Sequence, residues 1–116
     1  MTEETLYRTM LFDFYGELLT AKQKEYFDLH YNADYSLGEI AEMTGISRQG
    51  VWDIIKRAEE TLRKTEEKTG LIRRFREHQA VVAEMETNIE ALKQLTDGKA
   101  KALAETLSAS LNKLKG

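Results

Sequence analysis

Several polar side chains near the middle of the chain are of the types that bind nucleic acids. Arginine forms paired hydrogen bonds with guanine and glutamine forms them with adenine, while lysine and arginine also bind phosphate. On this basis Arg48 suits guanine, Gln49 suits adenine, and Lys56 or Arg57 suits phosphate. A serine hydroxyl at a helix N-terminus also takes a phosphate oxygen. The candidate nucleic-acid contacts are Ser47, Arg48, Gln49, Trp52, Lys56 and Arg57.

Residues 36–57 have the local signals of two helices joined by a tight turn. Ser36 and Glu39 form a capping box, which starts the first helix. Gly45 permits the left-handed backbone that ends this helix, and Ser47 is a good N-cap for the next one. A short turn that contains glycine between two helices is typical of the helix-turn-helix motif. We therefore predict a helix-turn-helix over residues 36–57.

The second helix of this motif meets base edges with its N-terminal residues. Arg48, Trp52 and Lys56 are spaced four apart, so we expect them to form one exposed ridge. Trp52 suits two roles, because an exposed tryptophan stacks on bases and also anchors protein interfaces.

Two residues of the second helix argue against simple DNA reading. Asp53 places a negative charge on the ridge, unless it pairs with Arg57 four residues further on. Gly50 weakens a helix by about 1 kcal/mol relative to alanine.

The blocks around this motif resemble known bacterial proteins. Residues 19–31, 35–41 and 45–49 resemble the promoter-reading C-terminal domain of sigma factors. The chain is more similar still to the YlxM family of small helix-turn-helix proteins. The blocks that carry this second resemblance are 11–15, 18–20, 34–41, 47–49 and 55–57, and it covers roughly residues 6–95.

The resemblance implies a fold and a cellular context. The fold is all-helical and sigma-like. The context is a regulatory part in the signal recognition particle pathway, assigned because the family's gene tends to lie beside the gene of the particle's protein. The particle's RNA and its targeting GTPases then become candidate partners.

The composition is that of a small helical protein. The 116 residues are 41% hydrophobic and 32% charged and include no proline, so we expect an all-α fold with one moderate core. The absence of cysteine excludes disulfides and thiolate metal sites. The first residues lack a signal-peptide pattern, and no apolar run is long enough to span a membrane. We expect a cytoplasmic protein that does not enter a membrane.

Charge is divided unevenly along the chain, whose net charge is −3. Residues 1–47 carry nine acids and three bases, whereas residues 48–78 carry six acids and nine bases. The basic strip includes Lys56, Arg57, Arg63, Lys64, Lys68, Arg73, Arg74 and Arg76. Because acids are interleaved with these cations, the strip suits either a nucleic-acid track or a solvated helix face.

We predict that residues 1–69 form a helical domain that contains the helix-turn-helix. Its first helix is expected from about Glu3 to Leu18, with Phe12 off the apolar face. That face consists of Leu6, Met10, Leu11, Phe14, Tyr15 and Leu18. A second capping box, Thr20 with Gln23, predicts another helix before the helix-turn-helix.

Residues 70–96 follow a heptad pattern, which predicts a long amphipathic helix packed lengthwise on another helix. This helix could fold back on the first helix or pair with a second copy. We expect a homodimer, because two-fold symmetry doubles the contacts on a palindromic DNA site. We expect residues 97–116 to form a docking helix or a tail that folds on a partner. The dimer seam is Leu71, Phe75, His78, Val82, Met85, Ile89 and Leu92.

Two classes of function follow from these patterns. The two histidines, His30 and His78, have no metal-binding neighbours, and no catalytic or phosphate-loop motif is present, so we expect no enzyme and no cofactor. The first class is a nucleic-acid-binding regulator, with DNA as the default target and RNA as the other. The second is a protein-interaction module that contacts targeting GTPases or other proteins; Trp52 and Asp53 favour this class.

Overall fold

The computed structural model describes residues 2–115, and these form two compact units divided after Ile72. Unit 1 is residues 1–72 and unit 2 is residues 73–116. The described residues are helical and contain no strand, which confirms the predicted all-α fold. The elements are α1 (Glu3–Tyr15), η1 (Gly16–Leu18), α2 (Ala21–Phe27), η2 (Asp28–Asn32), α3 (Leu37–Thr44), α4 (Arg48–Thr69), α5 (Leu71–Leu95) and α6 (Gly98–Leu114). No described helix has the length and apolarity needed to cross a membrane.

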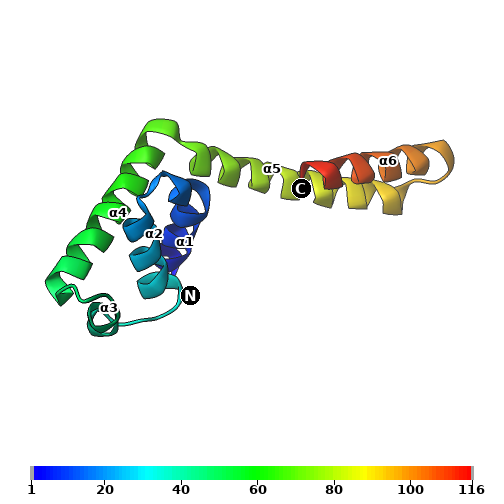
Figure 1. Ribbon diagram of the computed structural model, residues 1–116. Coiled ribbons are helices and arrows are strands. Elements are labelled where there is room, and N and C mark those ends of the chain that lie inside the picture. Colours follow the sequence, from blue (N-terminus) through cyan, green and yellow to red (C-terminus); the bar gives the residue numbers. More distant parts are fainter. Residues whose placement is uncertain (1, 116) are drawn as a thin grey trace. The chain divides into compact units, whose positions relative to one another are not determined.

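Unit 1 is built around α4, against which α1, α2 and α3 pack (Figure 1). Apolar residues of α4 recur at spacings of four, three and four, so they form one buried stripe along the helix. Aromatic residues of α2 and aliphatic residues of α1 and α3 complete the core. The buried core residues are Leu11, Tyr15, Leu19, Tyr26, Phe27, Ile40, Val51, Ile55, Ala58, Leu62 and Ile72.

The first helix differs from its predicted form. It ends at Tyr15, and the chain continues as one 3₁₀ turn to Leu18. Phe12, which the sequence placed off the apolar face, packs against the core with its ring stacked on Phe27, at 5.2 Å between centroids. Phe14, which the sequence placed on that face, is exposed. The apolar pattern extends around much of this helix, and contact with α2 decides which residues point inward.

A buried carboxylate closes the junction between α4 and α5. Gly70 ends α4 with a left-handed backbone (φ 62°), and α5 begins at the next residue. Glu66 Oε1 accepts hydrogen bonds from the Tyr15 hydroxyl at 2.6 Å and from the Ile72 amide at 3.0 Å. Burial, together with the hydrogen bond to Glu66, raises the pKa of Tyr15. Glu66 thus joins α1, α4 and the first turn of α5.

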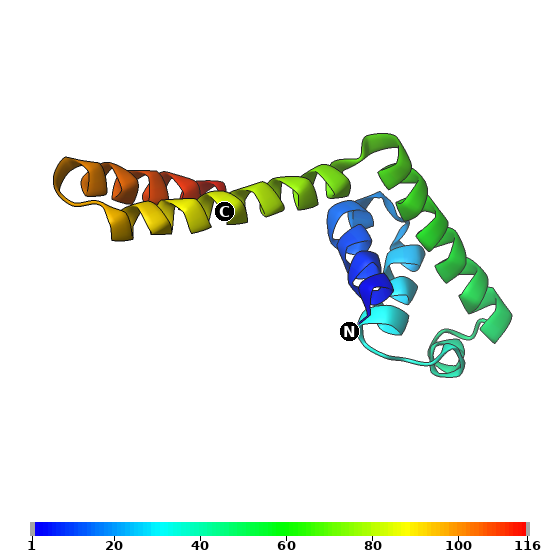
Figure 2. The same ribbon diagram turned by 180° about the vertical axis from the view of Figure 1, so that it is seen from behind.

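Unit 2 is a helical hairpin in which α6 runs back along α5 (Figures 1 and 2). Within residues 97–116, predicted as a docking helix or a tail, Gly98–Leu114 forms the helix α6. Lys93 Nζ donates to Ser108 Oγ at 3.2 Å, and Lys115 pairs with Glu86 at 3.0 Å. Two side chains, those of Ala104 and Leu111, are buried among the described residues of the hairpin.

Candidate nucleic-acid interface

The two helices of the motif are capped as the sequence predicts. Ser36 Oγ accepts from the Glu39 amide, and Glu39 Oε1 accepts from the Ser36 amide, each at 3.0 Å. The Ser36 backbone amide lowers the pKa of Glu39 by binding its charged form. Gly45 ends α3 with φ 75°, and Ser47 Oγ accepts from the Gly50 amide at 3.0 Å to cap α4. The helix-turn-helix prediction is therefore confirmed.

Gly50 has a steric role that cannot be inferred from its low helix propensity. A Cβ atom at this position would lie 2.7 Å from Ile46 Cγ2, which is closer than real Cβ contacts come. Ile46 packs against the core from the turn, so it has little freedom to move away. Gly50, which in the sequence counted against a DNA-reading helix, is thus required because Ile46 of the turn packs against the first turn of α4.

Arg48 lies beside α3. A Cβ atom added to Gly38 would come within 3.3 Å of Arg48 Nε, so the missing side chain of Gly38 leaves space for the guanidinium. Arg48 remains exposed at the N-terminal end of α4. It is available to a ligand that crosses the start of the second helix.

The outer side of α4 carries Gln49, Asp53, Lys56 and Arg57, all exposed. Gln49 Nε2 donates to Asp53 Oδ1 at 2.9 Å, so the partner of Asp53 is Gln49 and not Arg57, which the sequence offered as one alternative. Lys56 and Arg57 form no ion pair within residues 2–115. These two cations are therefore free to bind an anion.

Trp52 occupies a groove on the side of α4. It is half-buried and packs against the core, and its ring meets that of His30 edge-on at 6.5 Å between centroids. The groove has a volume of about 260 Å³. It is lined by Arg8, Tyr31, Trp52, Lys56, Glu59, Glu60 and Arg63.

The single exposed ridge predicted for Arg48, Trp52 and Lys56 is therefore wrong. Arg48 turns toward α3, Trp52 faces the groove, and Lys56 stands at the groove's exposed edge. The reason is the rotation of α4, which buries Val51 and Ile55 and leaves position 52 at the flank of the core. The outermost side chains are instead those of Gln49, Asp53, Lys56 and Arg57.

An ion network on the groove floor was not predicted from the sequence. The Glu59 carboxylate forms ion pairs with Arg8 Nε at 2.9 Å and with Arg63 Nε at 3.0 Å. Arg63 also pairs with Glu4. Burial by itself would raise the pKa of Glu59, but hydrogen bonds from Arg8 and Arg63 outweigh burial and lower it. Arg63, one cation of the basic strip, thus serves the fold. Glu4 lies 59 residues from Arg63, and Glu59 lies 51 residues from Arg8, so no local spacing indicates these two pairs. The pair of Glu59 and Arg63, four residues apart, has the spacing of a helical ion pair.

The capped turn and the exposed outer side of α4 define a helix-turn-helix protein. The chain matches, over residues 2–102, the UPF0122 family, described as "Putative helix-turn-helix protein, YlxM / p13 like". It belongs to this family, which confirms the resemblance seen in the sequence.

Several named relatives are similar to this chain over most of its length. A UPF0122 protein of Thermoanaerobacter sp. (strain X514) is 48% identical over 94 residues, which cover 81% of this chain and 80% of the relative. One from Caldanaerobacter subterraneus subsp. tengcongensis is 54% identical over 77 residues, 66% of each chain. One from Listeria welshimeri is 48% identical over 89 residues, 77% of this chain and 81% of the relative.

Proposed function

We propose that this protein is a nucleic-acid-binding regulator that uses the N-terminal half of α4 as its contact element. The observation that carries the proposal is the pair of exposed, unpaired cations, Lys56 and Arg57, on the outer side of a firmly capped helix. In helix-turn-helix proteins that side enters the major groove and the flanking cations hold the phosphates.

Each contact has a defined place in this arrangement. Gln49 projects outward for base contact, although it must first leave Asp53. Arg48 and the Ser47 hydroxyl stand at the start of α4, where Ser47 can donate to phosphate while its oxygen still accepts from Gly50. Lys56 and Arg57 follow two turns later and bind phosphate. Duplex DNA is the default target of such an element.

The Trp52 groove supports RNA as a second target. An unpaired base can stack on an aromatic side chain while a nearby cation holds its phosphate, and Trp52 lies beside Lys56. The family resemblance adds a context, the signal recognition particle pathway, in which the particle's RNA is the natural probe. We propose that pathway as the site of action on the resemblance alone.

Equilibrium titrations at several salt concentrations test the proposal. The probes are sheared duplex DNA from the native cell and the transcribed RNA of the signal recognition particle. Lys56→Ala and Arg57→Ala should each weaken binding to all sequences and reduce the salt slope by about 0.7–0.9. Arg48→Ala should cost about 1–3 kcal/mol on a specific site if Arg48 reads a base.

The matched control is Lys22→Ala, which removes an exposed lysine from α2. It should bind like the wild type. Wild-type protein that binds neither probe at low salt would refute the proposal, as would equal losses in the control and in the α4 variants.

A second candidate is a protein-interaction module that contacts the targeting GTPases or other proteins. Acids among the outer cations favour it, because Asp53 and Glu60 repel a phosphate backbone. The half-buried Trp52 also suits a hydrophobic anchor. A pull-down from the native cell separates the candidates. Proteins recovered with the wild type, lost with Trp52→Ala and insensitive to nuclease would favour this second function.

A further inference from the structure

Unit 2 exposes an unusual amount of apolar surface for its size. Its exposed large apolar side chains include five that are spaced along α5 and α6: Met85 44%, Leu92 46%, Leu103 67%, Leu107 52% and Leu114 73%. Surface apolar residues are ordinary when they are scattered, but a contiguous set indicates an interaction surface.

The helical geometry places them together. Ile89 of α5 and Leu111 of α6 are the more buried apolar residues, which marks the line along which the helices meet. At 100° per residue, Met85 and Leu92 lie about 40–60° from that line on α5, and the three leucines lie about 40–80° from it on α6. The sense of rotation is the same on both helices. Because the helices are antiparallel, both stripes fall on the same side of the hairpin.

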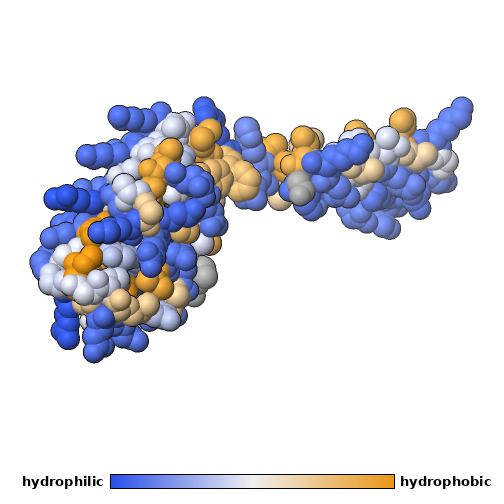
Figure 3. Space-filling model, in the orientation of Figure 1, coloured by the Kyte–Doolittle hydropathy of each residue, from blue (hydrophilic) through white to orange (hydrophobic). Residues whose placement is uncertain are grey.

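We define these five residues as the hairpin face. Its spacings are regular, since Met85 and Leu92 are seven apart, as are Leu107 and Leu114. The opposite side carries polar residues such as Glu90, Gln94, Glu105 and Asn112. Figure 3 shows apolar side chains gathered along the upper edge of the hairpin and hydrophilic ones below.

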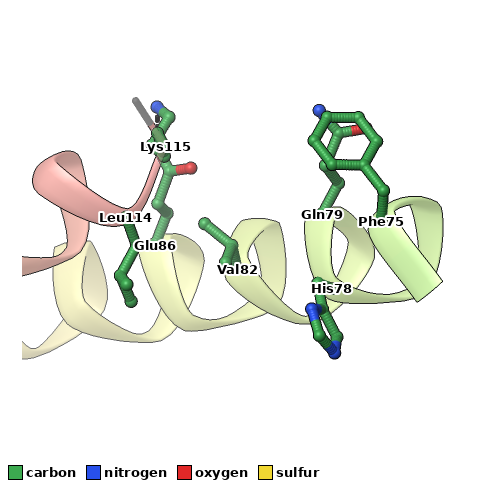
Figure 4. Close-up of a pocket in the computed structure, with 7 residues that line it drawn as sticks. All are labelled: Phe75, His78, Gln79, Val82, Glu86, Leu114 and Lys115. Carbon is green, nitrogen blue, oxygen red and sulfur yellow. Dashed lines mark hydrogen bonds and ion pairs between the residues drawn. The ribbon is translucent and has the colours of Figure 1, made fainter. Parts of the chain in front are cut away.

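A hollow at the end of α6 adds to this surface. It measures about 290 Å³ and lies where α6 ends while α5 continues (Figure 4). Phe75 and Val82 line it from α5 and Leu114 lines it from α6. Two of these, Phe75 and Val82, belong to the predicted seam. The apolar track of α5 thus continues beyond the part that α6 covers.

We propose that a second copy of this chain covers the hairpin face, so that two hairpins form a four-helix bundle. Four-helix bundles bury heptad-spaced stripes of this kind, and a two-fold axis makes one surface complementary to itself. The homodimer seam predicted from the sequence is revised in one respect. Val82 and Ile89 are already half-buried within the chain, and three of the five residues of the hairpin face are leucines of α6.

Two observations favour a second copy as the occupant. The hairpin buries only two side chains within residues 73–115, so its helices need further burial to remain ordered. Residues 79–116 carry five acids and five bases, so two copies meet without net repulsion. A partner of high net charge would find no opposite net charge on residues 79–116.

Light scattering after size-exclusion chromatography, over a range of concentrations, tests the proposal. The wild type should elute with twice the 13.4 kDa mass of one chain at micromolar concentration. Leu107→Glu places a charge on the hairpin face and should raise the dimer dissociation constant at least a hundredfold. Ala109→Glu adds the same charge to an exposed position on the other side of α6 and should leave the mass doubled.

Folding is checked in the same samples. Position 107 is already half-exposed in one chain, so Leu107→Glu should keep the fluorescence of Trp52 in unit 1. A milder variant, Leu107→Ala, should raise the dissociation constant by a smaller factor. A wild type that stays at 13.4 kDa up to 100 µM would overturn the proposal, and so would equal behaviour of Leu107→Glu and Ala109→Glu.

Discussion

The two units of this protein have similar sequence patterns and different interiors. Both are amphipathic helices with heptad-like spacing. In unit 1 four helices share one core, in which α4 alone buries Val51, Ile55, Ala58 and Leu62. In unit 2 two helices leave most of their leucines exposed. Apolar periodicity therefore predicts a helix and its apolar face, whereas the number of neighbouring helices determines whether that face is buried in a core.

The largest test of this contrast compares two leucines. Leu62→Ala removes a fully buried side chain from unit 1 and should lower the free energy of unfolding by about 2–5 kcal/mol. Leu95→Ala removes an exposed side chain at the end of α5 and should change it by less than about 0.5 kcal/mol. Urea denaturation followed by far-ultraviolet circular dichroism measures both, and Trp52, the single tryptophan, reports on unit 1. Similar losses in the two variants would remove the contrast.

A second test concerns two helical glycines within unit 1. Gly50→Ala should destabilise by about 1–3 kcal/mol, because the new Cβ meets Ile46 at 2.7 Å. Helix propensity alone predicts the opposite, a gain of about 1 kcal/mol. Gly38→Ala is the control, because its Cβ meets only the flexible Arg48 side chain. Thermal unfolding should show Gly38→Ala as neutral or slightly stabilised. A Gly50→Ala variant that unfolds at a higher temperature than the wild type would mean that Ile46 moves away from the added Cβ at little cost.

The smallest test uses pH to examine the ion network of unit 1. The pKa of Glu59 is lowered in the folded state, so its contribution is present above the unfolded value, about 4.3, and is lost as pH falls through the folded value. Unit 1 should therefore lose stability below about pH 4.3. Arg8→Gln removes one donor, which brings the folded pKa of Glu59 closer to the unfolded value, so the loss of stability on acidification should be smaller than in the wild type. Urea midpoints from pH 3 to 7 measure it, and parallel profiles for the two proteins would contradict the assignment.

The sequence predicted local features well, because they depend on neighbouring residues. The capping box at Ser36, the left-handed turn at Gly45 and the cap at Ser47 are all confirmed. Each is fixed by side chains within three residues of the backbone group that they satisfy. The all-helical fold followed from the same local signals and from the absence of proline.

Features that depend on distant residues were missed or misplaced. Trp52 was placed on a ridge because its spacing from Lys56 is helical, but the rotation of α4 is set by packing against α1 and α2. Phe12 was misplaced for the same reason. The pairing of Arg8 with Glu59 spans 51 residues and had no local signal. The sequence therefore predicted which helix holds the candidate contact residues, whereas the directions of their side chains depend on the tertiary structure.

The hydrogen bond from the Ile72 amide to Glu66 sets the shortest fragment that can retain the helix-turn-helix. A fragment ending at Gly70 would discard a core side chain, because Ile72 is 1% exposed. It would also deprive the Glu66 carboxylate of a backbone donor. Crystallisation of the helix-turn-helix unit alone should therefore start from a chain that extends at least one helical turn beyond Ile72.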